Sequence, residues 1–249
     1  MHIDHAALLF FAALAAGALN SVAGGGSFLA FPALLFTGMN AIAANATNTV
    51  ALWPGTVASA FAYRKEMKDR ATWKMLGPLF VVTFVGSIAG AILLLKTPEK
   101  TFVGLIPILL GMATLVFAFG PKLRDVMKVA RSPFVGTLLQ LVVAIYIGYF
   151  GAGAGILMLA LFSLMGMKNI HAMNAFKSLL ATLANGVAVV TFIVARKVVW
   201  PEALLMTAGA AIGGYGGAFL AQRIDPKRVR WIVIVIGCAM TVYFAVKRP

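Results

Sequence analysis

The chain has 249 residues, of which 61% are hydrophobic and only 11% charged, and its mean hydropathy is +0.95. Soluble globular domains carry about 25% charged residues, so this composition excludes soluble enzymes and nucleic-acid binders, although the net charge is +14. The composition predicts a protein that lies in a lipid bilayer.

Three uncharged runs follow one another from the N-terminus, over residues 6–63, 75–95 and 101–121. A transmembrane helix needs about 20 apolar residues, and each run is long enough. Backbone amides in hydrocarbon must be paired inside a helix or a closed barrel, and the runs lack the alternation of barrel strands. We therefore predict an all-α polytopic membrane protein with about 8 to 10 membrane segments.

Basic residues gather in three clusters that are separated by weakly basic loops. The positive-inside rule assigns strongly basic loops to the cytoplasm, so we expect all three clusters on the same side of the membrane. The clusters are Arg64, Lys65, Lys68, Arg70 and Lys74; Lys122, Arg124, Lys128 and Arg131; and Arg223, Lys227, Arg228 and Arg230.

A glycine-rich motif occurs twice, at residues 23–27 and 151–155, with an offset of 128. Each copy is followed by a Gly-Met pair at the same spacing, so we predict two repeats, 1–130 and 131–249. The weakly basic loop at 96–100 in the first half corresponds to residues 223–230 in the second half, which hold the third basic cluster. Equivalent loops of the two halves are therefore expected on opposite sides of the membrane. The repeats are therefore predicted to be inverted, with both chain ends outside, and parallel repeats remain the alternative.

Each half is predicted to contain a first helix that ends at the glycine cluster, a short piece (27–38 and 155–166) and a long helix (41–63 and 170–195). Twelve residues of helix cover about 18 Å, against a bilayer core of about 30 Å. The short pieces should therefore be half-helices, with glycine-rich breaks at 20–27 and 148–155 inside the protein.

Paired broken helices in corresponding halves are typical of a transporter's binding site. Helix N-termini carry a partial positive charge, so two of them near the midplane favour an anion. The alternative is that these glycines only allow close helix packing. That alternative is favoured for two other glycine pairs, Gly86 with Gly90 and Gly213 with Gly217. The candidate substrate-binding residues are Asn20, Ser21, Gly24, Gly25, Gly26, Ser27, Thr47, Asn48, Gly151, Gly153, Gly155, Asn174 and Lys177.

Lys177 lies about 10 Å into the long helix that begins at residue 170, and its counterpart in the first repeat is Thr49. Ionisable residues in hydrocarbon are costly and are therefore functional candidates, although the lysine stem can also extend to the interface. All seven acidic residues fall in loops or at helix ends, and Cys238 is the single cysteine. We predict no metal and no cofactor.

The pattern of residues 17–27, Pro32, the Gly38-Met39 pair and residues 44–48, repeated more loosely from Gly148, resembles the sulfite exporter TauE/SafE family, also described as a sulfonate uptake permease family. The resemblance covers nearly the whole chain. It implies a polytopic permease of the bacterial cytoplasmic membrane that moves sulfite, sulfonates or related organosulfur anions. The position equivalent to Pro32 holds Ala160, so the second break is expected to be less pronounced.

The predicted function is therefore transport of small anions by alternating access, and not catalysis. A channel-like anion pathway and a membrane assembly partner without transport remain as alternatives. The expected partners are a small anionic substrate and the lipid bilayer, with a homo-oligomer left open and no nucleic acid. The expected location is the inner membrane, with several passes.

Overall fold

The computed structural model of the chain describes residues 3–22, 25–64, 70–126, 133–167, 169–221 and 226–246. Within these ranges the regular secondary structure is helical throughout, which confirms the all-α prediction. The ten helices there are α1 (Ile3–Val22), α2 (Ser27–Phe36), α3 (Ala41–Ala62), α4 (Arg70–Lys96), α5 (Glu99–Val126), α6 (Pro133–Tyr149), α7 (Ala154–Leu164), α8 (Ile170–Val194), α9 (Trp200–Ala221) and α10 (Pro226–Val246).

The helices α1 to α5 and α6 to α10 follow the same order of long and short elements. The short helices α2 and α7 have 10 and 11 residues, which confirms the two predicted short pieces. At 1.5 Å per residue they are about 15 and 17 Å long, so neither crosses a bilayer core of about 30 Å. The predicted long helices correspond to α3 and α8, and the runs 75–95 and 101–121 lie within α4 and α5.

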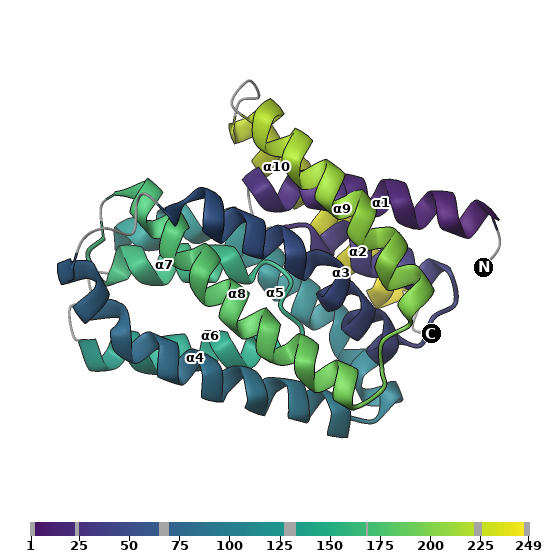
Figure 1. Cartoon of the computed structure of the whole chain (residues 1–249), viewed down its shortest axis with the longest axis horizontal. Helices are drawn as coiled ribbons and strands as arrows, with labels where there is room; N and C mark the ends of the chain where they lie inside the picture. The colour runs from purple at the N-terminus through teal and green to yellow at the C-terminus, as the bar shows by residue number, and fades with distance from the viewer. Residues whose placement is uncertain are drawn as a thin grey trace.

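The two sets of five helices interleave and do not form separate bodies (Figure 1). The first helix, α1, packs along α9, and α4 packs along α6. Each of these pairs joins one helix from the first half of the chain to one from the second. The structural core therefore depends on both halves.

Corresponding helices of the two halves also meet directly, because α3 packs on α8 and α5 on α10. The Trp53 indole N–H donates to the Thr182 carbonyl at 3.0 Å, and the hydroxyls of Ser59 and Ser178 are 3.1 Å apart. Residue numbers rise along α3 as they fall along α8, so these two helices run antiparallel. The contacts between α5 and α10 have the same antiparallel sense.

Glycines allow the very close approach of α1 to α9 and of α4 to α6. A Cβ atom at Gly90 would overlap the Ile145 carbonyl oxygen of α6, and one at Gly213 would overlap the Leu14 carbonyl oxygen of α1. Three of the four glycines predicted to pack helices, Gly86, Gly90 and Gly213, lie at such contacts. The surroundings of the fourth, Gly217, are not described.

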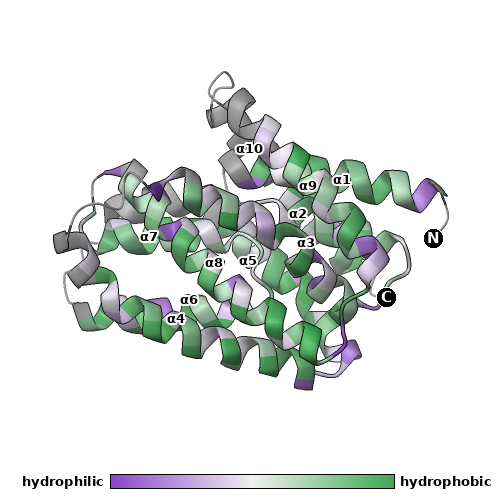
Figure 2. Cartoon of the chain, viewed as in Figure 1, coloured by the Kyte–Doolittle hydropathy of each residue, from purple (hydrophilic) through white to green (hydrophobic). Residues whose placement is uncertain are grey.

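Hydrophobic residues occupy most of the described helices (Figure 2), and many large apolar side chains among them are exposed. Examples are Phe134, which is 76% exposed, and Val194, which is 77% exposed. Soluble monomers rarely expose apolar patches beyond a few hundred Å², whereas a lipid-facing surface requires them. Two helical segments, Leu76–Lys96 and Ala172–Val194, are long and apolar enough to span a membrane by length and composition alone. The surface is therefore that of a membrane protein.

The predicted orientation rests largely on residues whose side chains are not described. Lys65, Lys68, Lys128, Arg131 and Arg223 lie outside the described residues, and most of the other cluster members lie in helix ends without described side chains. Arg64 is described, and its guanidinium donates to the Phe61 carbonyl at 3.0 Å. The sidedness of the clusters stays a prediction.

Candidate functional site

The first glycine cluster lies between α1 and α2, as predicted. Gly24 falls outside the described residues, and so does the side chain of Ser21. The Gly26 N–H donates to the Asn20 side-chain oxygen at 2.8 Å, so this amide is not the free anion donor that the sequence predicted. Because the carboxamide oxygen of Asn20 already accepts this N–H, the side-chain NH2 of Asn20 is the group that is left to donate to a substrate.

The second cluster separates α6 from α7 and is a full break. Gly151 and Gly153 have φ angles of 74° and 72°, a left-handed conformation that glycine adopts without steric cost. The Tyr146 hydroxyl donates to the Ala152 carbonyl at 2.6 Å, which fixes the loop against α6. Ala160, which stands where the first repeat has Pro32, therefore does not weaken the break, because left-handed glycines, and not proline, interrupt the helix.

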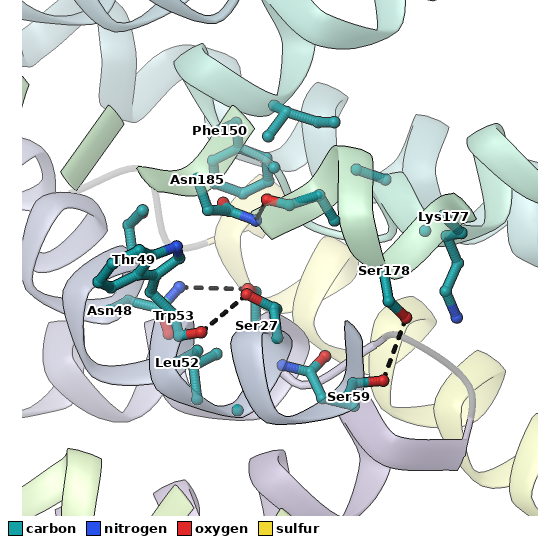
Figure 3. Close-up of a pocket in the computed structure, with 18 residues that line it drawn as sticks. Ser27, Asn48, Thr49, Leu52, Trp53, Ser59, Phe150, Lys177, Ser178 and Asn185 are labelled. Atoms are coloured by element: carbon teal, nitrogen blue, oxygen red, sulfur yellow. Dashed lines mark hydrogen bonds between the residues drawn. The ribbon is translucent and has the colours of Figure 1, made fainter. Parts of the chain in front are cut away.

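The two breaks and the helices α3 and α8 surround a pocket of about 90 Å³ (Figure 3). This space is several times the roughly 10–15 Å³ that one water molecule requires. Six of the predicted site residues line it: Asn20, Ser27, Asn48, Gly151, Gly155 and Lys177. The described lining includes no carboxylate, and its polar side chains are Asn20, Ser27, Asn48, Thr49, Trp53, Thr56, Ser59, Lys177, Ser178 and Asn185.

Five other predicted residues are described but do not line the pocket. Thr47 is fully buried, and its hydroxyl accepts from the Val199 N–H at 3.1 Å, which ties α3 to the loop before α9. Gly153 caps α7 and faces Ala113 and Phe28. The residues that lie outside the lining are Gly25, Gly26, Thr47, Gly153 and Asn174.

Lys177 is half-buried and lies on the pocket wall, which agrees with its predicted depth in α8. Its ammonium donates to the Asn174 side-chain oxygen at 2.9 Å. An ammonium has three N–H donors, so two remain after this contact. Among the described residues that line the pocket, it is the one full charge.

Several lining residues were not among the predicted site residues: Thr49, Trp53, Thr56 and Ser59 on α3, and Ser178 and Asn185 on α8. The spacing of three or four residues between 49, 53, 56 and 59 is that of a single helix face. This polar face of α3 could therefore have been recognised from the sequence. The helix-to-helix bonds of Trp53 and Ser59 could not be inferred without knowing that α3 packs on α8.

A cluster of buried aromatic rings adjoins the pocket at the second break. Phe150 lines the pocket and contacts Phe31 edge-on, with ring centroids 5.3 Å apart. Phe102 packs against both rings, at 6.5 Å from Phe31 and 6.2 Å from Phe150. Tyr149 contacts Phe102 and reaches the Thr97 hydroxyl at 3.4 Å. The rings therefore form a continuous series of contacts from the pocket to the turn between α4 and α5.

A second, more apolar cavity lies among α2, α3, α5 and α10, and Glu99 is its acidic lining residue. The Glu99 carboxylate accepts the backbone N–H groups of Ala41 and Ile42 at the start of α3. It therefore serves as a helix cap. Among the described residues no group of three His, Cys, Asp or Glu side chains is placed to hold a metal ion.

Comparison of the sequence with known proteins identifies its family. The sequence profile of the family described as sulfite exporter TauE/SafE matches residues 9–244. This chain belongs to the TauE/SafE family. No solved structure matches it significantly.

TauE/SafE relatives of similar length occur in several bacteria. A probable membrane transporter protein of Haemophilus influenzae is 28% identical over 244 residues, which cover 96% of this chain and 94% of the relative. The probable membrane transporter protein YfcA of Escherichia coli K12 is 30% identical over 240 residues, with 94% and 87% covered. A Sinorhizobium protein, the probable membrane transporter protein ORF9, is 29% identical, with 95% and 90% covered. The family and these relatives indicate a membrane transporter.

Proposed function

We propose that this chain is a multi-pass transporter of the bacterial inner membrane that moves small anions, sulfite, sulfonates or related organosulfur anions, by alternating access. The observation that carries the proposal is the chemistry of the pocket. Its one full charge among the described lining residues is the ammonium of Lys177. A pocket with a cation and without a carboxylate attracts anions and repels cations.

The polar side chains of the pocket also have unused hydrogen-bond donors. Each carboxamide has two N–H donors and each hydroxyl has one. Asn48 donates one N–H to Ser27 and Asn185 donates one to the Ala181 carbonyl. Their second N–H groups and the Ser27 hydroxyl have no recorded acceptor among the described residues. The oxygen atoms of a sulfur oxyanion are suitable acceptors for all of them.

An inverted repeat supports alternating access in this proposal. Corresponding helices α3 and α8 pack antiparallel, as the contacts of Trp53 with Thr182 and of Ser59 with Ser178 together indicate. An in-plane two-fold axis makes corresponding helices antiparallel, whereas an axis along the membrane normal makes them parallel. The start of α1 and the end of α10 also lie at the same end of the molecule (Figure 1). A pseudo-symmetric pair of broken helices can then open a central site to either side.

Uptake of radiolabelled sulfite into proteoliposomes tests the transport proposal. We expect saturable uptake that unlabelled sulfite inside the vesicles accelerates by exchange. Uptake that stays linear with concentration and shows no exchange would favour the channel-like pathway. Vesicles with folded protein but no flux of sulfite, sulfate, thiosulfate or a short sulfonate would favour a non-transporting assembly partner. A homo-oligomer stays a prediction, which mass measurement in detergent checks.

Replacing Asn48 with aspartate is expected to abolish anion uptake. The change keeps the size of the side chain but places a carboxylate in the pocket, opposite in sign to Lys177. A like charge beside the anion costs several kcal/mol at short range, which corresponds to a loss of about a hundredfold or more. Initial uptake rates measured at equal amounts of folded protein give the result.

The matched control is Asn169→Asp. Asn169 is exposed and accepts the Ala172 N–H at the start of α8, a capping position where aspartate serves equally well. It adds the same charge outside the pocket, so wild-type uptake is expected. Equal uptake by wild type and Asn48→Asp would remove Asn48 from the substrate path.

A further inference from the structure

Seven of the ten polar residues of the pocket form two groups at different levels along α3 and α8, and Thr49, Trp53 and Thr56 lie between Asn48 and Ser59 along α3. We call Asn20, Ser27, Asn48 and Asn185 the inner group, and Lys177, Ser59 and Ser178 the lysine group. Figure 3 shows Ser27 and Asn48 apart from Lys177, Ser178 and Ser59. The inner group adjoins the first break, whereas the lysine group lies near the end of α3 and the start of α8.

The separation of the two groups exceeds the size of a small oxyanion. Asn185 lies eight residues after Lys177 on α8, which is about 12 Å of helix. Ser59 lies eleven residues after Asn48 on α3, which is about 16 Å. Since an oxyanion accepts hydrogen bonds at about 2.7–2.9 Å, one sulfite ion does not contact donors at both levels.

The direction of the lysine side chain increases this separation. The Lys177 ammonium is bonded to the Asn174 oxygen at 2.9 Å. Asn174 lies one turn earlier on α8, towards the start of the helix and away from Asn185. The full positive charge is therefore turned away from the inner group.

The lysine group has enough donors to hold an anion by itself. The hydroxyls of Ser59 and Ser178 are 3.1 Å apart, and one of them donates to the other. This bond uses one of the two hydroxyl hydrogens and leaves the second available. Together with the two remaining N–H groups of Lys177, the lysine group has three donors for the oxygen atoms of a sulfur oxyanion.

We propose that the pocket holds two anion positions, a loading position at Lys177, Ser59 and Ser178 and a neutral inner position at the broken helices. The inference rests on the proposed anion transport. The full charge captures the anion at the loading position, and the inner position, which binds through uncharged donors, passes it across. A selective pathway sustains flux when binding is favourable enough for the ion to enter and, because it is divided over several sites, weak enough for the ion to leave.

Equilibrium dialysis of the purified full-length protein against radiolabelled sulfite tests the number of positions. We expect the wild type to bind two sulfite ions per chain and Lys177→Gln to bind one. Lys197→Gln removes the same charge from an exposed site outside the pocket lining, so it should still bind two. A single ion bound to the wild type, together with normal flux, would overturn the two positions and leave the transport proposal intact. No bound ion and no flux would instead overturn the transport proposal.

Transport kinetics provide the second measurement. Loss of a charge-assisted hydrogen bond should raise the half-saturating sulfite concentration of Lys177→Gln by about tenfold or more, with a maximal rate within about threefold of wild type. Asn48→Asp should lose transport at every sulfite concentration, including saturating ones. A folded Lys177→Gln protein without transport at saturating sulfite would contradict a loading role, because the lysine would then belong to a single central site.

Discussion

Alanine at position 90 or 213 is expected to prevent stable folding of this chain. Gly90 and Gly213 lie where α4 meets α6 and where α1 meets α9, and a methyl group at either position would overlap a backbone carbonyl of the facing helix. A backbone oxygen cannot rotate away as a side chain can, so the helices must separate along their length. We expect losses at or above the upper end of the roughly 1–3 kcal/mol typical of overpacked cores.

The same helices provide matched controls for this prediction. A Cβ atom would meet nothing within 4 Å at Gly77 in α4 or at Gly216 in α9. Gly77→Ala and Gly216→Ala should therefore keep wild-type stability or gain up to about 1 kcal/mol from the better helix propensity of alanine. Thermal unfolding in detergent, followed by size-exclusion chromatography, measures all four variants. Equal melting temperatures for Gly90→Ala and Gly77→Ala would show that the helices are not in close contact.

Removal of the Phe150 ring is expected to destabilise the protein and to open the pocket towards the turn between α4 and α5. Phe150 is 3% exposed and Phe31 is fully buried, and a buried Phe→Ala change costs about 3–5 kcal/mol. The cavity left by the ring would extend the pocket to Phe102, which with Tyr149 then remains between the pocket and Thr97. We therefore expect Phe150→Ala to lower the melting temperature and to increase sulfite leak without exchange.

Phe134→Ala is the control for this second prediction, because Phe134 is 76% exposed on the outer surface. It should leave both the melting temperature and the exchange of sulfite close to wild type. If Phe150→Ala were less stable but showed no increase in leak, the aromatic cluster would serve packing and not closure of the pocket.

The broken helices could be predicted from the sequence because the same irregularity occurs twice. A single glycine cluster is common in membrane helices, but the repetition at a fixed offset located both breaks and both short helices. The charges that flank the uncharged runs located α4 and α5. The interleaving of the halves could not be predicted, since the pairing of α1 with α9 is a tertiary contact between segments far apart in sequence.

The rotation of α3 explains which of its predicted site residues line the pocket. Asn45, Thr47, Asn48 and Thr49 are all polar, so polar side chains point in most directions around α3. Packing alone decides that Asn48 and Thr49 face the pocket while Thr47 faces the loop before α9. The bond between Asn174 and Lys177 has the three-residue spacing of helical neighbours, which could have marked Asn174 as the partner of the lysine.

The packing of α1 along α9 has a consequence for biosynthesis. Helix α1 is synthesised before α2 to α8 and has to remain in the bilayer without its native neighbour until α9 has been made. During that interval the alanine-rich surface of α1 is open to other nascent segments, including those of another copy. Truncation before α9 should therefore yield a product that quality-control proteases remove, even though it retains the complete first repeat.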